Sequence, residues 1–279
     1  MIPRWCITLA GTALVFGSMM AATNANAATT HSAHMHPGVT HVRPGGPVGG
    51  FQPGGLIAHP STADAVGQVH GVRNASESSN WSGYAATGGT GAFSSVSSNW
   101  TEPAADCGDG GTEYAAFWVG LDGYNSDSVE QTGTDSDCSG GSPDYYGWYE
   151  MYPADPVYYN NPVSPGDSMS ASVSVSGDNY SLVLTDNSQG WTQTQNIAES
   201  GLSDSSAEVI TEAPSDEFGP LPLADFGTIN YGGSTANGQS MANFGPDQII
   251  MVGSSGDQLD STSSMDGSGD FSNTWSAES

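Results

Sequence analysis

The chain has 279 residues, is rich in Gly and Ser, and carries 30 Asp and Glu residues against three Lys or Arg, a formal net charge of −27. The three bases and all six histidines precede residue 74, whereas all but one of the acids follow it. A Ser–His–Asp triad, a Cys–His pair, a Ser–Lys pair and a His-ligated zinc site therefore cannot be built from residues 74–279. We also expect no nucleic-acid binding, because acids without bases repel phosphates. The groups that remain available for catalysis in residues 74–279 are carboxyl, amide, hydroxyl and phenol groups.

Residues 1–27 have the pattern of a secretory signal peptide. Arg4 precedes the apolar run ITLAGTALVFGSMMAA, which leads to the small-x-small pattern Ala25-Asn26-Ala27. The alternative, a membrane anchor, is disfavoured because the run is shorter than the roughly 20 residues needed to span and no stop-transfer charges follow. We expect cleavage after Ala27, an extracellular protein, and no membrane attachment of the mature chain.

Residues 28–75 differ in composition, as in HMHPGVTHVRPGGPVGGFQPGG. This His/Pro/Gly-rich segment has little apolar periodicity and cannot bury a core, so we interpret it as a propeptide or leader. His34 and His36 could ligate a metal, but scattered histidines in such a tract are more often solvated. The folded domain is then expected over residues 76–279.

From residue 80 onward, short alternating segments separated by Gly, Asp and Ser predict strands. They cover residues 80–86, 94–101, two segments within 113–133, 145–152, 168–175, 180–185, 206–211, 226–231, 248–252 and 271–275. The segments 168–175 and 180–185 predict a hairpin around the turn at 176–179. No segment of ten residues has the apolar stripe of a helix. About twelve to fourteen strands in one domain predict an all-β fold, a two-layered antiparallel β-sandwich.

The segment EYAAFWVGLDGYNSDSVEQTG (113–133) predicts a sheet with two different faces. Successive side chains of a strand point oppositely, so Phe117, Val119 and Leu121 share one face. The other face is expected to hold Trp118, Gly120 and Asp122 in the first strand and Val129, Gln131 and Gly133 in the second. By the same alternation Glu212 shares a face with Glu208 and Ile210. Such a polar and aromatic face is either surface or the floor of a groove.

Two cysteines remain after the signal peptide with its Cys6, namely Cys107 and Cys138. In an oxidising compartment an even number predicts a disulfide, with two unpaired thiols as the alternative. The bond would close a loop of about thirty residues and stabilise the fold by roughly 3–4 kcal/mol.

Several runs resemble the glutamic peptidases, the eqolisin family of scytalidoglutamic peptidase, in order and rough spacing. They are FWVGLDG (117–123), EQTG (130–133), GWYEMYP (147–153), SPGD (164–167), AEVITEAPS (207–215) and PLADFG (222–227). The resemblance extends over residues 80–275. It implies two seven-stranded antiparallel sheets, one of them bent into a substrate groove, and a reaction without metal or cofactor.

The family pairs a Gln on the QTG strand with a Glu at the end of the A-E-x-x-x-E strand, which correspond here to Gln131 and Glu212. Glu208 is the rival for the catalytic Glu, and its place in the motif implies a supporting acid. The resemblance also implies substrate-contacting or supporting roles for Trp118, Asp122, Glu150 and Tyr152. Two positions depart from the family pattern, Glu130 and Val209, and alternation predicts that both point away from the face of the pair.

The resemblance implies a monomeric, pepstatin-insensitive endopeptidase that cleaves polypeptides in acid. Ionised Glu212, with a pKa near the ordinary 4.3 or so of Glu, would take a proton from water and later protonate the leaving nitrogen. Gln131 would stabilise the oxyanion. Because the acids of this cation-free domain repel one another, we expect stability to fall as the pH rises from about 4 toward neutrality.

Two alternatives come from other classes. A glycoside hydrolase could use Glu150 and Glu212 as its paired carboxylates, in which case Gln131 is dispensable. A non-catalytic module that binds sugars or cell walls could use the aromatic residues Trp118, Trp148 and Tyr152 as a platform, and it would turn over no protein.

Overall fold

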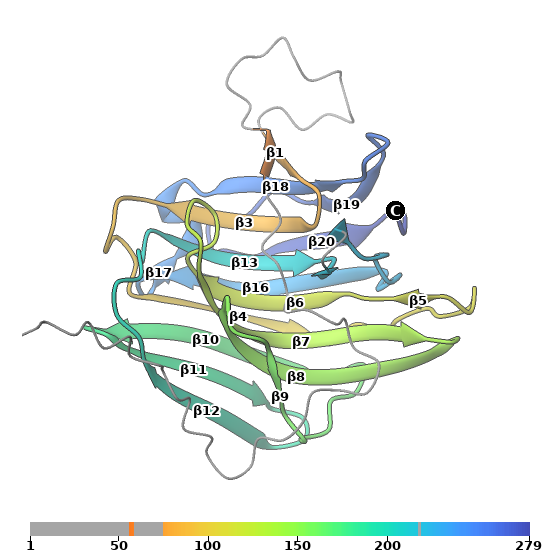
Figure 1. The fold of residues 1–279 in the computed structure, drawn as a ribbon, viewed down its shortest axis with the longest axis horizontal. Helices are drawn as coiled ribbons and strands as arrows, with labels where there is room; N and C mark the ends of the chain where they lie inside the picture. Colours follow the sequence, from red (N-terminus) through yellow and green to blue (C-terminus); the bar gives the residue numbers. More distant parts are fainter. Residues whose placement is uncertain (1–55, 59–74, 217–218) are drawn as a thin grey trace, which may run out of the picture. The chain divides into compact units, whose positions relative to one another are not determined.

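The computed structural model describes residues 56–58, 75–216 and 219–279 (Figure 1). The predicted signal peptide and nearly all of the predicted leader, including every histidine, lie outside the described residues, so these assignments stay predictions. No helix among the described residues is long and apolar enough to cross a membrane.

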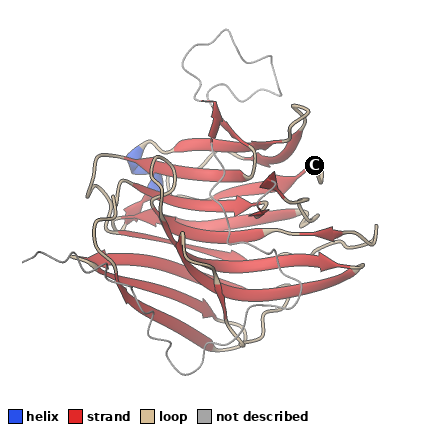
Figure 2. Ribbon diagram, viewed as in Figure 1, coloured by secondary structure: helices blue, strands red, loops and turns tan. Residues whose placement is uncertain are grey.

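The regular secondary structure of the described chain is almost entirely strand (Figure 2). Its only helix in the described part is the short 3-10 helix η1 (Met241–Phe244). The strands are β1 (Leu56–Ala58), β2 (Ser76–Ser78), β3 (Trp81–Thr87), β4 (Ser95–Thr101), β5 (Thr112–Glu113), β6 (Ala116–Leu121), β7 (Val129–Ser139), β8 (Ser142–Tyr152), β9 (Val157–Tyr158), β10 (Ser168–Ser176), β11 (Asn179–Asp186), β12 (Trp191–Ala198), β13 (Ser206–Glu212), β14 (Ser215–Asp216), β15 (Gly219–Pro220), β16 (Thr228–Ala236), β17 (Gln239–Ser240), β18 (Asp247–Val252), β19 (Gln258–Thr262) and β20 (Phe271–Trp275).

The strands pair in one antiparallel ladder, which runs β12-β11-β10-β4-β16-β20-β19-β18-β3-β13-β6-β7-β8-β9. β2 adds to β18 in parallel. The predicted antiparallel architecture is confirmed, but the two expected sheets are halves of one 18-stranded sheet, because β18, β19 and β20 connect them. β14 and β15 form a separate ribbon.

The two halves face one another across one apolar core. Val173 and Leu182, from the β10–β11 hairpin, join Phe117, Val119 and Leu121 of β6 in it. The predicted alternation of β6 and the predicted hairpin are thus confirmed. A second, smaller apolar cluster lies on the opposite face of β6 and contains Trp81, Ala85, Ala116, Trp118, Tyr124, Val129, Trp148, Ile210 and Ile249. Every residue of β6 and β13 is therefore buried.

Two full strands, β12 and β19, were not predicted. β12 reads WTQTQNIA and ends the ladder, so only its Gln195 is buried and it lacks apolar alternation. β7 and β8 also extend further than expected, because the polar residues Thr134 and Ser136 of β7 are buried. Their hydroxyls donate to the buried carboxylate of Glu102 at 2.6 and 2.8 Å.

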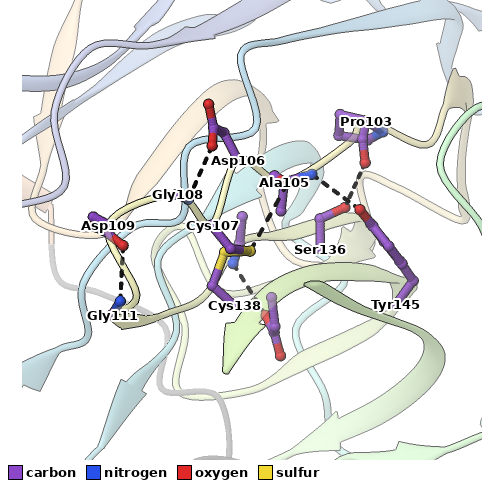
Figure 3. Close-up of a disulfide and its surroundings, with 12 residues drawn as sticks. Pro103, Ala105, Asp106, Cys107, Gly108, Asp109, Gly111, Ser136, Cys138 and Tyr145 are labelled. Carbon is purple, nitrogen blue, oxygen red and sulfur yellow. Dashed lines mark hydrogen bonds between the residues drawn. A yellow bond between two sulfur atoms is a disulfide. The ribbon is translucent and has the colours of Figure 1, made fainter. Parts of the chain in front are cut away.

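The predicted disulfide between Cys107 and Cys138 is present (Figure 3). It joins the loop after β4 to the end of β7 across a sequence separation of 31 residues. Cys138 is fully buried and pairs in register with Pro143 of β8.

Replacing both cysteines by Ala should lower the free energy of unfolding by about 3–4 kcal/mol, because the unfolded chain regains the freedom of a loop of roughly thirty residues. Urea unfolding at pH 4 measures the loss, and the wild type treated with reductant should shift in the same direction. Coincident midpoints for the variant and the oxidised wild type would contradict the prediction.

Candidate active site

Gln131 and Glu150 are direct cross-strand neighbours on β7 and β8. The Gln131 amide donates through Nε2 to Glu150 Oε2 at 2.6 Å. The amide nitrogen carries a second hydrogen beyond this one. Gln131 Oε1 and Glu150 Oε1 are buried and have no hydrogen-bond partner, so each can still accept a hydrogen bond. Antiparallel pairing thus creates a polar pair from residues 19 apart in sequence.

Glu212 ends β13 on the same face and is held by neutral N–H donors. Asn80 Nδ2 donates to Oε1 at 3.1 Å, and the indole of Trp118 donates to Oε2 at 2.9 Å. Trp81, the register partner of Glu212 on β3, packs edge to face against Trp118 with a centroid distance of 5.0 Å. Residues from β3, from the turn just before it and from β6 therefore surround the Glu212 carboxyl.

The electrostatics connect Glu212 with the Gln131–Glu150 pair. Burial raises the pKa of Glu212 to about 8, against the opposing effect of its N–H donors. Burial first, and then the charge of Glu212, raises the pKa of Glu150 well above its ordinary value, while the Gln131 hydrogen bond lowers it. Glu212 is only 1% exposed. The expected near-ordinary pKa of Glu212 is therefore not found, because the structure removes its carboxyl from water.

The structure gives Asp122 a different neighbourhood, whereas Glu208 lies on the same face as Gln131, separated from it by Gly120 of β6, which pairs with both residues. Asp122 follows the end of β6 with a positive φ of 66°, and its carboxylate accepts the backbone N–H groups of Ser203, Asp204 and Ser205 at 2.7–2.9 Å. It anchors the turn before β13, and none of these bonds reaches Gln131 or Glu212. Glu208 is buried, both of its oxygens lack a hydrogen-bond partner, and its pKa is raised by burial and then by the charges of Asp122 and Glu130.

The other predicted positions lie as follows. Tyr152, at the end of β8, is half-buried and packs against the second apolar cluster. The register confirms that Glu130 and Val209 point away from Gln131, since their partners Leu121 and Val119 belong to the main core.

Sequence reasoning missed three residues of this face, Asn80, Trp81 and Asp135. The indole of Trp148 donates to Asp135 Oδ1 at 2.7 Å. Asp135 lies two positions beyond the predicted end of its strand, so a longer strand would have placed it beside Gln131 and Gly133. No local pattern identifies Asn80, because its bond to Glu212 joins residues 132 apart.

Two groups of acids among the described residues have the spacing of metal ligands, and neither includes Gln131, Glu150 or Glu212. They are Asp122, Glu130 and Asp204, and Asp109, Glu113 and Glu278. The site consists of carboxyl, amide and indole groups on one sheet face. Such a set can transfer protons and donate hydrogen bonds to a developing negative charge.

An all-β scaffold with these buried carboxyl and amide groups on one face is compatible with a hydrolase that works by proton transfer. The profile of the Peptidase A4 family matches residues 79–275, and the chain belongs to this family. It is a glutamic-type endopeptidase that acts on polypeptides, and the glycosidase and sugar-binding alternatives do not hold. Among functionally curated proteins, none matches the chain.

Solved structures of glutamic peptidases are similar to this chain. Scytalido-glutamic peptidase with a transition state analog inhibitor is 25% identical with a TM-score of 0.61, covering 71% of this chain and 98% of its own. Aspergilloglutamic peptidase from Aspergillus niger is 25% identical with a TM-score of 0.51, covering 59% of this chain and 99% of its own. The eqolisin SCP-B in complex with the tripeptide Ala-Ile-His shares the fold at 23% identity and a TM-score of 0.57, covering 71% of this chain and 98% of its own.

Stability should decrease from pH 4 to pH 8. Burial raises the pKa of Glu102, Glu130 and Glu212 to about 8 and that of Asp260 to about 7. In the unfolded chain these groups ionise near pH 4, so the native state holds more protons between pH 4 and 8. Each such group therefore lowers the stability as the pH rises, until its native pKa is reached.

Urea unfolding at constant ionic strength at pH 4, 6 and 8 measures this trend. Unfolding midpoints that increased with pH would contradict the prediction, because they would show that ionising the buried acids does not destabilise the native state.

Trp118→Phe removes an N–H donor that favours the ionised form of Glu212, so it should raise the pKa of Glu212 and move the pH profile of kcat/KM upward. The lost hydrogen bond should lower kcat/KM roughly 10- to 100-fold, corresponding to about 1.5–3 kcal/mol. Peptide cleavage measured from pH 2 to 9, a range that includes the pKa of about 8 of Glu212, provides both quantities.

Trp100→Phe is the matched control. Trp100 donates to the buried carboxylate of Glu102 at 3.2 Å, outside the candidate site. This variant should lose stability and keep the wild-type pH profile. Equal pH profiles for both variants would argue against a link between Trp118 and Glu212 chemistry.

Proposed function

We propose that this peptidase is secreted, works in acid, and uses Gln131 and Glu212 as its catalytic pair. The observation that carries the proposal is the shared buried face on which Gln131 donates to Glu150 while the charge of Glu212 raises the pKa of Glu150. These side chains also occupy the positions that match the family motifs. The predicted signal peptide supports secretion, and the absence of cations beyond residue 73 supports work in acid.

Glu212 would move the protons of the reaction. Ionised, it takes a proton from the water that attacks the scissile carbonyl carbon, and it then gives that proton to the leaving nitrogen. The free N–H of Gln131 donates to the oxyanion, and its Oε1 can orient the water. Hydrolysis adds one water across the peptide bond and leaves Glu212 as it began.

The pKa of about 8 for Glu212 bears on the first step. In acid the resting carboxyl is protonated, so it must release its proton before it can accept one from water. The scissile carbonyl oxygen takes this proton while Glu212 takes one from the attacking water and passes it to the leaving nitrogen. The hydroxyl formed from the carbonyl returns its proton to Glu212 as the carbon–nitrogen bond breaks, so Glu212 ends protonated as it began. Acid then maintains the protonated resting form and also favours departure of a protonated amine.

The substrates are polypeptides. Two solved relatives were crystallised with a transition state analog inhibitor and with a tripeptide. We further infer that the mature protein is an extracellular monomer without membrane attachment.

Gln131→Ala and Glu212→Gln should each lower kcat by at least about 100-fold, since each removes a group that acts on the reacting atoms. The assay is digestion of denatured protein at pH 3–4 with pepstatin present to inhibit contaminating aspartic peptidases. Glu208→Gln is the control, because Glu208 lies on the same strand but interacts with Asp122 and Glu130. Thermal midpoints verify that each variant is folded.

If Glu208→Gln abolished cleavage while Glu212→Gln preserved it, the catalytic Glu would be Glu208. Near-normal cleavage by Gln131→Ala would exclude the pair altogether.

A further inference from the structure

The indole N–H of Trp81 is a buried donor without an acceptor. Trp81 is 1% exposed, and its Nε1 has no hydrogen-bond partner. All other buried side-chain atoms without a partner, among the described residues, are oxygens. A carboxyl oxygen can hold a proton and a hydroxyl group can rotate toward a neighbour, whereas an indole nitrogen can only donate. Because buried polar groups are seldom left unpaired, this N–H requires an explanation.

Glu212 is the acceptor beside this N–H. Trp81 begins β3 and is the direct cross-strand partner of Glu212 on β13. Burial dominates the pKa of Glu212, and the N–H groups of Trp118, Trp81 and Asn80 each lower it, so the Trp81 N–H acts on the carboxyl. In the resting structure, however, Oε1 already accepts from Asn80 and Oε2 from Trp118. Trp81 therefore adjoins Glu212 without completing a hydrogen bond to it.

Packing fixes the Trp81 indole in this place. Its ring meets Trp118 edge to face at a centroid distance of 5.0 Å. Gly123, in the loop after β6, also packs against it, since a Cβ at Gly123 would come within 3.0 Å of Trp81 Cη2. The close-packed ring cannot turn its N–H toward a different acceptor without displacing these neighbours.

The protonation state of Glu212 explains why the N–H is unpaired. With a pKa of about 8, the Glu212 carboxyl is protonated in acid. A protonated carboxyl has its own hydrogen at one of its acceptor positions, whereas a carboxylate accepts at about four. In the proposed mechanism Glu212 gives a proton to the scissile carbonyl oxygen and later one to the leaving nitrogen. It carries negative charge as each proton departs, and it can then accept a third hydrogen bond.

We propose that Trp81 is a positioning residue of the reaction, whose N–H donates to Glu212 only while Glu212 is ionised. The proposal rests on the proposed function, because it requires Glu212 to be the proton-transferring group. An interaction that forms in the transition state and is absent from the resting enzyme accelerates the chemical step. Asn80 and Trp118 are bonded in the resting enzyme too, so they mainly hold the carboxyl in place.

The titratable side chains around Glu212 on this face are acids and phenols, which do not supply the same stabilisation. They are Glu150 on β8, Glu208 on β13, Asp135 on β7, and Tyr124, Tyr152 and Tyr158. The charge of Glu212 raises the pKa of Glu150, after the larger effect of burial, so these two charges oppose each other. Residues 74–279 contain no Lys, Arg or His. Neutral donors such as the Trp81 N–H must therefore compensate the charge on Glu212.

Trp81→Phe should lower kcat about tenfold or more at pH 3–4 and change KM less than about twofold, because the N–H acts only once Glu212 ionises. The lost donor should also raise the pKa of Glu212 and move the pH profile of kcat upward, which a merely structural change would not do. In urea at pH 4 this variant should lose less stability than Trp118→Phe and Trp100→Phe. Those two give up the same ring atoms and, in addition, a hydrogen bond of the folded protein.

Benzothienylalanine at position 81 has the shape of Trp with sulfur in place of the N–H, so it separates the donor from the ring volume. It should reproduce the loss of kcat and keep wild-type stability in acid. A wild-type kcat with this replacement would overturn the proposal, as would an unchanged kcat with a raised KM, which would mean that the N–H binds the substrate.

Glu212→Gln, assayed in parallel, tests the proposed function separately. If Glu212→Gln is inactive while both replacements of Trp81 cleave like the wild type, the role of Trp81 is wrong and the proposed function stands. If Glu212→Gln still cleaves, the proposed function fails and the role of Trp81 fails with it.

Discussion

The constraint on which this structure depends is that its carboxyl groups are buried in a domain without cationic side chains. A buried carboxylate is stable only when donors, a counter-charge or a proton compensate for lost hydration. The chain supplies donors that carry no charge, above all indole N–H groups. The indole N–H of Trp100 donates to the carboxylate of Glu102, that of Trp118 donates to Glu212, and that of Trp148 donates to Asp135. These donors only partly offset burial, so the pKa values of Glu102 and Glu212 remain raised to about 8.

In the proposed function the same constraint connects stability with activity. Carboxyl groups that keep their protons in acid make the fold most stable at the pH at which a protonated Glu212 is proposed to act on the substrate. Glu102 serves only the core, where Trp100, Thr134 and Ser136 surround it, whereas Glu212 lies on the opposite face of the sheet with Gln131 and Glu150. The two residues have the same type of environment. The different roles that we propose for them therefore follow from the side of the sheet on which each carboxyl lies.

The sequence alone allowed much of this arrangement to be predicted. Period-two alternation placed Trp118 and Gln131 on one face and Val119 in the core, and the register confirms it. Family motifs selected Glu212, which no composition argument would separate from the other acids. The bond of Asn80 to Glu212 could not be predicted, because long-range pairing produces it. The raised pKa of Glu212 was also missed, since it depends on how completely packing excludes water.

An amide at position 131 has a physical reason in this setting. Gln131 adjoins Glu150, whose pKa is raised by burial and by the charge of Glu212. A third carboxyl group there would add repulsion without providing a donor in its ionised form. A cation would stabilise an oxyanion, but it would also lower the pKa values of both neighbouring acids and remove their protons in acid. An uncharged N–H donor can stabilise negative charge on the substrate while leaving Glu150 and Glu212 protonated, and the side-chain amide of Gln131 provides such a donor together with an acceptor oxygen.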